Sequence, residues 1–264
     1  MINKFLIIKV FICFFFVFFS NKALTQDLVF NATEIITSDN ENIIRASNGV
    51  NIVDPSGLII NGDEIEYNKS KSILKVLGNV IVIDKINNNV LEAEEIIYFK
   101  LLDIINTKNV TTVNVNKKHI IETSNLIYNF NLKEFSSTNK TNIKDLYNNR
   151  LNVSEFNYSI LDKILRAENA VVIDSDSNKY NIKKLRFNLQ KNKIVGKDIR
   201  VDFNNKLFNS LENQPRLSGN AIFLDKDSTI IKKGVFTTCK KTDSCPPWQM
   251  SSREIKHDKI KKTL

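Results

Sequence analysis

Hydrophobic and polar residues alternate along most of the chain beyond its apolar N-terminus. In the stretch 182–189, Leu185 and Phe187 fall on one side of an extended chain. Lys184 and Arg186 fall on the other side. Such alternation predicts strands of a sheet that has one apolar face and one wet face. No long stretch of this part of the chain keeps the i, i+3, i+4 apolar stripe of a helix.

The alternation is organised in a repeat of about thirty residues. Its marker is an apolar residue followed two positions later by an aromatic one, and successive copies begin 31, 30, 30 and 29 residues apart. The five marker pairs are Ile65 and Tyr67, Ile96 and Tyr98, Leu126 and Tyr128, Phe156 and Tyr158, and Leu185 and Phe187. A late and weaker copy is Ile255 and His257. The even spacing predicts one supersecondary unit per repeat.

A second marker lies about midway between these pairs. In it, a small or polar residue directly precedes an apolar residue. It occurs at 48–50, 78–80, 108–110 and 168–170, and less regularly at 196–199 and 219–221. Turn-forming residues separate the expected strands. They lie at 54–57, 61–62, 68–71, 87–89 and 174–178. Each unit then holds two strands, and seven units give about fourteen strands between Gln26 and Phe236.

A sheet with one apolar face must cover that face. Folding the sheet over on itself covers it and leaves an elongated groove that can hold acyl chains. In that arrangement the ten residues of the five marker pairs line the groove. The same pattern also fits two sheet halves that pack fully together and leave no cavity, so both arrangements stay open.

The N-terminus predicts a signal peptide over residues 1–25. Lys4 and Lys9 give a short positive region, and the stretch 5–19 is apolar apart from Lys9. A spanning helix needs about 20 apolar residues, and polar residues follow this run at once. The pattern favours a removed secretion signal, with an uncleaved anchor as the alternative. Export places the rest of the chain in an oxidising compartment, where disulfides are permitted.

Charge and candidate chemistry favour binding over catalysis. The net charge of +9 suits an anionic partner, although the basic residues are spread along the chain and equally fit a solvated surface. Catalytic motifs and metal-ligand spacings are absent from the sequence, so we predict no enzyme, no metal and no cofactor. His119 follows two lysines, and we expect a surface histidine. The tyrosines share a face with aliphatic residues, which argues against a base-stacking platform and a nucleic-acid partner.

The composition changes after Phe236. Cys239, Cys245, the Pro246–Pro247 pair and Trp248 all fall within this short segment. Paired prolines interrupt a sheet, so we interpret residues 237–264 as a junction out of the repeat array. Two thiols without further nearby ligands make a poor zinc site, which leaves Cys239 and Cys245 as disulfide candidates.

Two parts of the sequence resemble a known family. The repeat, with Leu-Gly-Asn-Val-Ile-Val at 77–82 and Ala-Glu-Glu-Ile-Ile-Tyr at 93–98, resembles the organic-solvent-tolerance-A-like domain of the lipopolysaccharide transport proteins LptA, LptC and LptD. The segment from Gly234 to Trp248 is similar to the region before the transmembrane barrel in LptD members. The resemblance implies an all-β, elongated twisted β-jelly roll over residues 26–236, open along one side, whose interior carries lipid A acyl chains without breaking a bond.

The same resemblance implies partners and a location. They are lipopolysaccharide, an LptA-like bridge protein that stacks by its strands, and an LptE-like lipoprotein bound through the barrel, at the periplasmic face of the outer membrane. The sequence holds no barrel, so we expect a partial or truncated chain. Cys239 and Cys245 then pair with each other, or one pairs with the barrel. Alternatives are a stand-alone LptA-like or LptC-like bridge protein and a β-solenoid structural or adhesin protein.

Overall fold

The computed structural model describes residues 28–55, 57–146, 149–205, 213–242, 247–261 and 263. The expected signal peptide and Cys245 lie outside these residues. The described residues form a sheet of nineteen strands and one 3-10 turn, Lys100–Leu102. None of their helical segments is long and apolar enough to cross a membrane. The expected all-β class is confirmed.

The strands follow one another along the chain. They are β1 (Val29–Ser38), β2 (Ile43–Val53), β3 (Leu58–Gly62), β4 (Glu64–Asn68), β5 (Ile73–Asp84), β6 (Asn89–Phe99), β7 (Ile104–Val115), β8 (His119–Ser124), β9 (Ile127–Asn129), β10 (Glu134–Ser137), β11 (Thr141–Asp145), β12 (Arg150–Val153), β13 (Glu155–Ser159), β14 (Ile164–Ile173), β15 (Lys179–Asn188), β16 (Lys193–Asp202), β17 (Arg216–Leu224), β18 (Ser228–Thr237) and β19 (Met250–Asp258).

In four places, two consecutive short strands together form one long strand with a short interruption. These pairs are β3 with β4, β8 with β9, β10 with β11, and β12 with β13. Both members of a pair lie between the same two long strands, the one before and the one after in the sequence. If each pair is counted as one strand, the chain forms fourteen long strands from β1 to the end of β18 at Thr237. This number agrees with the two strands per repeat that the sequence predicts.

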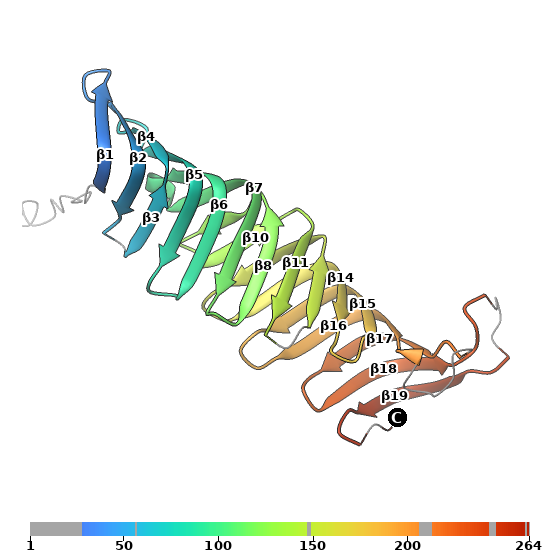
Figure 1. The fold of residues 1–264 in the computed structure, drawn as a ribbon. Coiled ribbons are helices and arrows are strands. Elements are labelled where there is room, and N and C mark those ends of the chain that lie inside the picture. Colours follow the sequence, from blue (N-terminus) through green and yellow to red (C-terminus); the bar gives the residue numbers. More distant parts are fainter. Residues whose placement is uncertain are drawn as a thin grey trace, which may run out of the picture.

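Each long strand pairs antiparallel with the strands before and after it, so the sheet is a meander that runs along the molecule from blue to red (Figure 1). Neighbours are joined by hairpins and not stacked as successive coils. The β-solenoid alternative is therefore wrong for the described residues.

The second sequence marker lies where a long strand bends near its middle. Asn48, Asn79, Asn109 and Asn169 have positive φ at these points, a conformation that asparagine tolerates better than most residues. The bend changes which residues face inward. On β15, the side chains at 180, 182, 185 and 187 are all buried, so the alternation skips one position at the bend. Strict alternation would place 182 and 185 on opposite faces.

The bends divide the sheet into two arms. We call one the Asp arm, because three of its strands end at or directly before an aspartate, namely Asp54, Asp84 and Asp174. The other is the Tyr arm, which carries the aromatic residues of the five marker pairs. The apolar faces of both arms belong to one contiguous hydrophobic cluster. Of the two arrangements that the sequence leaves open, the structure shows the one in which the halves of the sheet pack together.

The residues Asn61 and Gly62 do not form the expected turn. They lie at the end of β3, next to a bend. A Cβ atom on Gly62 would lie 2.4 Å from Cγ1 of Val76. Glycine therefore allows close packing between neighbouring strands at this position, and the chain does not reverse here.

The sheet also continues past the expected boundary at residue 236. β19 pairs with β18 from Phe236 opposite Met250 to Ser228 opposite Asp258. Ile255 is buried and lies opposite Ile231, so the late marker copy is part of the array. The segment 237–264, interpreted as a junction outside the array, thus adds a strand because its apolar residue extends the inner face.

Candidate functional site

The aromatic residues of the repeat form one row on the inner face of the Tyr arm. In the register, Tyr67 lies opposite Leu74, which lies opposite Tyr98 on the next strand. The row runs through Ile44, Tyr67, Leu74, Tyr98, Ile105, Tyr128, Phe135, Tyr158, Leu165, Phe187 and Ile194. Because two strands separate successive copies, an aromatic ring recurs about every 10 Å along the molecule.

The apolar members of the marker pairs lie in the next row toward the bend. Ile65 lies opposite Val76, and Val76 lies opposite Ile96. All ten marker residues are buried, with exposed fractions of 8% or less. The structure thus brings together the whole set that the sequence assigned to the interior. Contact of these residues with a lipid stays a prediction.

The Asp arm supplies a matching apolar row. Ile52 lies opposite Ile60, which lies opposite Val82. The row continues through Leu91, Val113, Ile121, Ile143, Leu151, Val172, Tyr180, Val201, Leu217 and Phe236. An apolar lining therefore extends without a break from β2 to β18, along nearly the full length of the sheet.

The free ends of the two arms meet along one side of the molecule, which we call the mouth. Among the described residues, no strand of one arm pairs with a strand of the other across the mouth. Side chains make the contact. The hydroxyl of Tyr128 donates a hydrogen bond to a carboxylate oxygen of Asp84, which is only 6% exposed. Tyr98 donates to Asp103 within its own arm at 3.5 Å and also interacts with Asp54 of the Asp arm.

The two tyrosine–aspartate contacts across the mouth have the same stagger. Asp54 directly follows β2 and interacts with Tyr98 of β6, and Asp84 ends β5 and interacts with Tyr128 of β9. Both pairs join long strands three positions apart in the meander, which corresponds to about 14 Å along the sheet. The strands of the two arms therefore cross obliquely, and each contact ties together residues that lie 44 positions apart in the sequence.

The tyrosines at the mouth are neutral donors. Burial raises the pKa of Tyr128 well above its usual range, and the hydrogen bond with Asp84 raises it further. Burial, followed by the charges of Asp54 and Asp103, also raises the pKa of Tyr98. The pKa of Tyr158 rises to about 12 through burial alone. Buried carboxylates need such donors, because an unpaired buried charge is strongly unfavourable.

His119 is not the surface histidine that the sequence predicts. It opens β8, and its ring packs edge-on against Phe187 of the Tyr arm with 6.3 Å between the ring centres. Burial lowers its pKa, partly opposed by the charge of Asp145. Further along, Phe203 and His257 make a similar edge-on contact at 6.0 Å. Aromatic contacts thus close this part of the mouth.

Side chains fill the interior in this conformation. Tyr128 contacts Phe130 and Phe135, with 3.9 and 4.2 Å between the ring centres. Tyr128 and Phe135 are at most 1% exposed. An acyl chain can enter among these residues only if the arms separate at the mouth, where the contacts are made by side chains alone.

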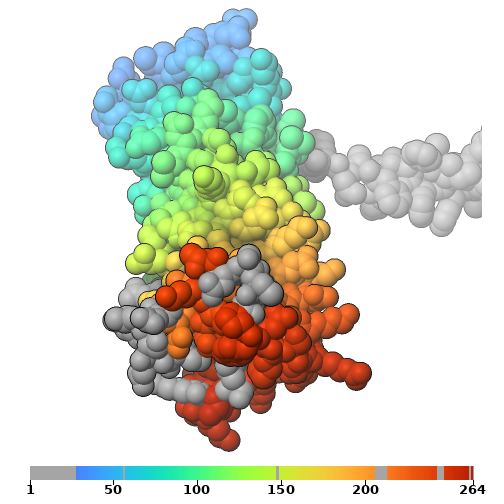
Figure 2. Space-filling model, turned by 90° about the vertical axis from the view of Figure 1, so that its right-hand side faces the viewer, coloured from blue at the N-terminus to red at the C-terminus, as the bar shows by residue number. Residues whose placement is uncertain are grey.

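The two ends of the sheet differ. At the C-terminal end, which faces the viewer in Figure 2, Trp248 packs against Phe236 with 6.0 Å between the ring centres. Its carbonyl oxygen also accepts a hydrogen bond from Thr237. At the other end, β1 pairs with β2 alone among the described residues, and Ile35 on it is 49% exposed. The N-terminal edge therefore presents free backbone groups and apolar side chains.

Of the two disulfide candidates, Cys239 lies among the described residues. Cys239 is half-buried, and its Sγ atom lies 3.6 Å from the carbonyl oxygen of Trp248. Its partner candidate Cys245 lies outside the described residues, so the pairing stays a prediction. The part of the chain that the structure describes contains no group of three His, Cys, Asp or Glu residues placed to hold a metal ion.

Comparisons with known proteins find likeness among solved structures alone. No family model and no curated protein matches the chain. Among solved structures, it is similar to the crystal structure of LptH, described as the LptA homologous periplasmic component of the lipopolysaccharide transport device from Pseudomonas aeruginosa. The match has 10% sequence identity and a TM-score of 0.24, and it covers 54% of this chain and 82% of that chain. A likeness this slight carries no argument about function.

Proposed function

We propose that this chain carries lipopolysaccharide by holding lipid A acyl chains between the Asp arm and the Tyr arm. The observation that carries the proposal is the unbroken apolar lining, because hydrocarbon can lie or move along it without meeting a polar barrier. Each Å² of hydrocarbon surface removed from water contributes about 25 cal/mol, so a lipid is held without specific polar contacts. No step of this function makes or breaks a covalent bond.

The mouth supplies the route of entry. Separating the arms breaks side-chain contacts, such as the hydrogen bond between Tyr128 and Asp84, and leaves every backbone pairing of the sheet intact. The polar head of the lipid can then remain in water beside the turns while its chains enter. A fully closed barrel would instead have to break strand pairing to admit a lipid.

The free edges of the sheet support the proposed partners. Within the part of the chain that the structure describes, β1 and β19 each pair with a single strand, so either edge can add a strand from another chain. We propose an LptA-like bridge protein at such an edge. The resemblance of the segment from Gly234 to Trp248 favours an LptD-type role at the outer membrane, with an LptE-like lipoprotein, over a stand-alone bridge protein.

Photo-crosslinking tests the proposal on a single strand that crosses both arms. A photoreactive amino acid replaces Tyr98 in the Tyr arm or Leu91 in the Asp arm, and labelled lipopolysaccharide is added. Their neighbours Ile97 and Glu92 face outward and serve as matched controls. We expect adducts at the two inner positions only. Equal labelling of inner and outer positions, or none at the inner ones in a folded protein, would contradict the proposal.

A further inference from the structure

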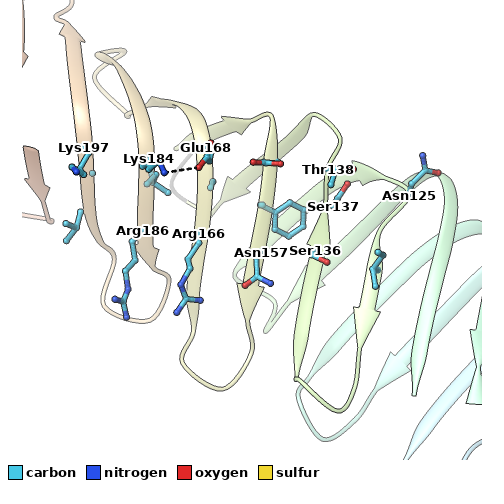
Figure 3. Close-up of a pocket in the computed structure, with 17 residues that line it drawn as sticks. Asn125, Ser136, Ser137, Thr138, Asn157, Arg166, Glu168, Lys184, Arg186 and Lys197 are labelled. Carbon is cyan, nitrogen blue, oxygen red and sulfur yellow. Dashed lines mark ion pairs between the residues drawn. The ribbon is translucent and has the colours of Figure 1, made fainter. Parts of the chain in front are cut away.

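The outer face of the sheet carries a trough with a volume of about 590 Å³, over β9, β10 and β13 to β16 (Figure 3). It lies on the opposite side of the sheet from the interior. Two rows of outward side chains border it, each crossing several strands. The first row runs through Asn157, Arg166, Arg186 and Val195. The second row runs through Glu168, Lys184 and Lys197.

The arginines in the first row are an unmatched pair of charges. Arg166 of β14 and Arg186 of β15 lie directly opposite each other, and both are exposed. Their side chains extend side by side in Figure 3. Neither forms an ion pair with a described residue, whereas Lys184 in the second row lies 3.4 Å from Glu168. Like charges placed directly opposite destabilise a sheet, so this pair indicates a site for an anion.

An apolar strip continues the row beyond Arg186. Val195 lies opposite Arg186, Phe223 lies opposite Val195, and Ile230 follows on β18. Val195 and Phe223 are each 44% exposed, although they lie side by side on an outer face that is otherwise mostly polar. Neighbouring strands are about 4.8 Å apart, so the strip extends about 14 Å from the guanidinium pair. Exposed apolar residues that gather in this way mark binding surfaces.

We propose that this outer face binds a phosphate-bearing amphiphile. Arg166 and Arg186 hold the phosphate, since the planar guanidinium matches phosphate oxygens with two parallel hydrogen bonds. The hydrocarbon part lies across Val195 and Phe223. The charge pair and the apolar strip share one row, which fits a single molecule with both characters better than a free anion. The site does not depend on whether the interior carries a lipid.

Calorimetric titration of the whole chain tests the site. The probe is a short-chain phosphatidic acid used below its micelle concentration, compared with inorganic phosphate and with the matching short-chain phosphatidylcholine, which has no net charge. We expect phosphatidic acid to bind at least about tenfold more tightly than either comparison ligand, because only this probe combines hydrocarbon for the apolar strip with a phosphate monoester whose negative charge is not offset by a choline group.

Substitutions separate the two parts of the site. The double variant Arg166→Gln/Arg186→Gln should weaken phosphatidic acid binding by about tenfold or more. Its matched control is Arg150→Gln/Arg253→Gln, which removes the same charge from exposed positions on β12 and β19 and should bind normally. Phe223→Ser should weaken binding of the amphiphile and leave that of inorganic phosphate unchanged.

Stability gives a readout that a purely structural role would not produce. Removing a like-charge pair should leave the melting temperature of Arg166→Gln/Arg186→Gln unchanged or raise it. The proposal is overturned if the control variant loses as much affinity, if inorganic phosphate binds as tightly as the amphiphile, or if the arginine variant binds normally. Failure of crosslinking at Tyr98 and Leu91, with this titration positive, would reject the interior function and retain the outer site.

Discussion

The hydrogen bond between Tyr128 and Asp84 provides the sharpest test of how the mouth is held closed. Tyr128→Phe removes only the donor hydroxyl and keeps the ring against Phe130 and Phe135. A hydrogen bond to a charged group contributes about 1.5–3 kcal/mol. Asp84 keeps two bonds from Asn87, at 3.0 Å to its backbone N and 2.7 Å to its Nδ2. We therefore expect a loss of about 1–2 kcal/mol.

The matched control for this substitution is Tyr158→Phe. Tyr158 lies in the same row and is 1% exposed, but its hydroxyl has no hydrogen-bond partner among the described residues. Tyr128→Phe should lower the melting temperature by about 2–8 °C, measured by circular dichroism, and Tyr158→Phe should change it little. Equal losses in both variants, or no loss in Tyr128→Phe, would refute the idea that the hydroxyl ties the arms together.

Two further predictions concern packing and pH. Gly196→Ala should destabilise the protein by about 1–3 kcal/mol, measured by urea denaturation, because the new Cβ would lie 2.4 Å from Cγ2 of Ile182. An unchanged urea midpoint would show that the neighbouring strands move apart enough to accept the methyl group. Burial lowers the pKa of folded His119 below its ordinary value of 6.5, so its contribution to stability is complete above that pH and is lost as the pH falls toward the folded pKa. Melting temperatures at about pH 7.5 and about pH 5.5 should therefore differ more in the wild type than in His119→Gln, and parallel pH dependence in the two proteins would exclude this role.

The sequence predicts the strands, the repeat and the inner face because each depends on local spacing. Residues two apart share a face, and residues about thirty apart lie in one row once each repeat forms two hairpin-connected strands. Tyr67, Tyr98 and Tyr128 could be assigned to one face for this reason. Ile182 could not, because the bend at the middle of β15 shifts the alternation by one position.

The contacts across the mouth could not be predicted in this way. The pairing of Asp84 with Tyr128 depends on how obliquely the two arms cross, which is a property of the twisted sheet as a whole. A signal was nevertheless present, since Asp54 and Asp84 lie 30 residues apart, at the same period as the tyrosines. The sequence pattern correctly predicts a turn at Asp54. It does not show that the side chain of this turn residue is also buried and hydrogen-bonded. The same holds for His119. Its polar neighbours in the sequence indicate a surface position, but its ring contacts Phe187, which lies 68 residues away.

Separation of the arms at the mouth, which admits hydrocarbon, is the step on which the proposed function depends. Spin labels at Lys85 and Leu132, which are exposed and lie on the turns beside Asp84 and Tyr128, report the distance across the mouth. Pulsed electron spin resonance should show a single short distance for the free protein and a longer one after lipopolysaccharide is added. An unchanged distance distribution, under conditions where bound lipid is detected, would mean that the chains lie elsewhere and that the interior is only a core.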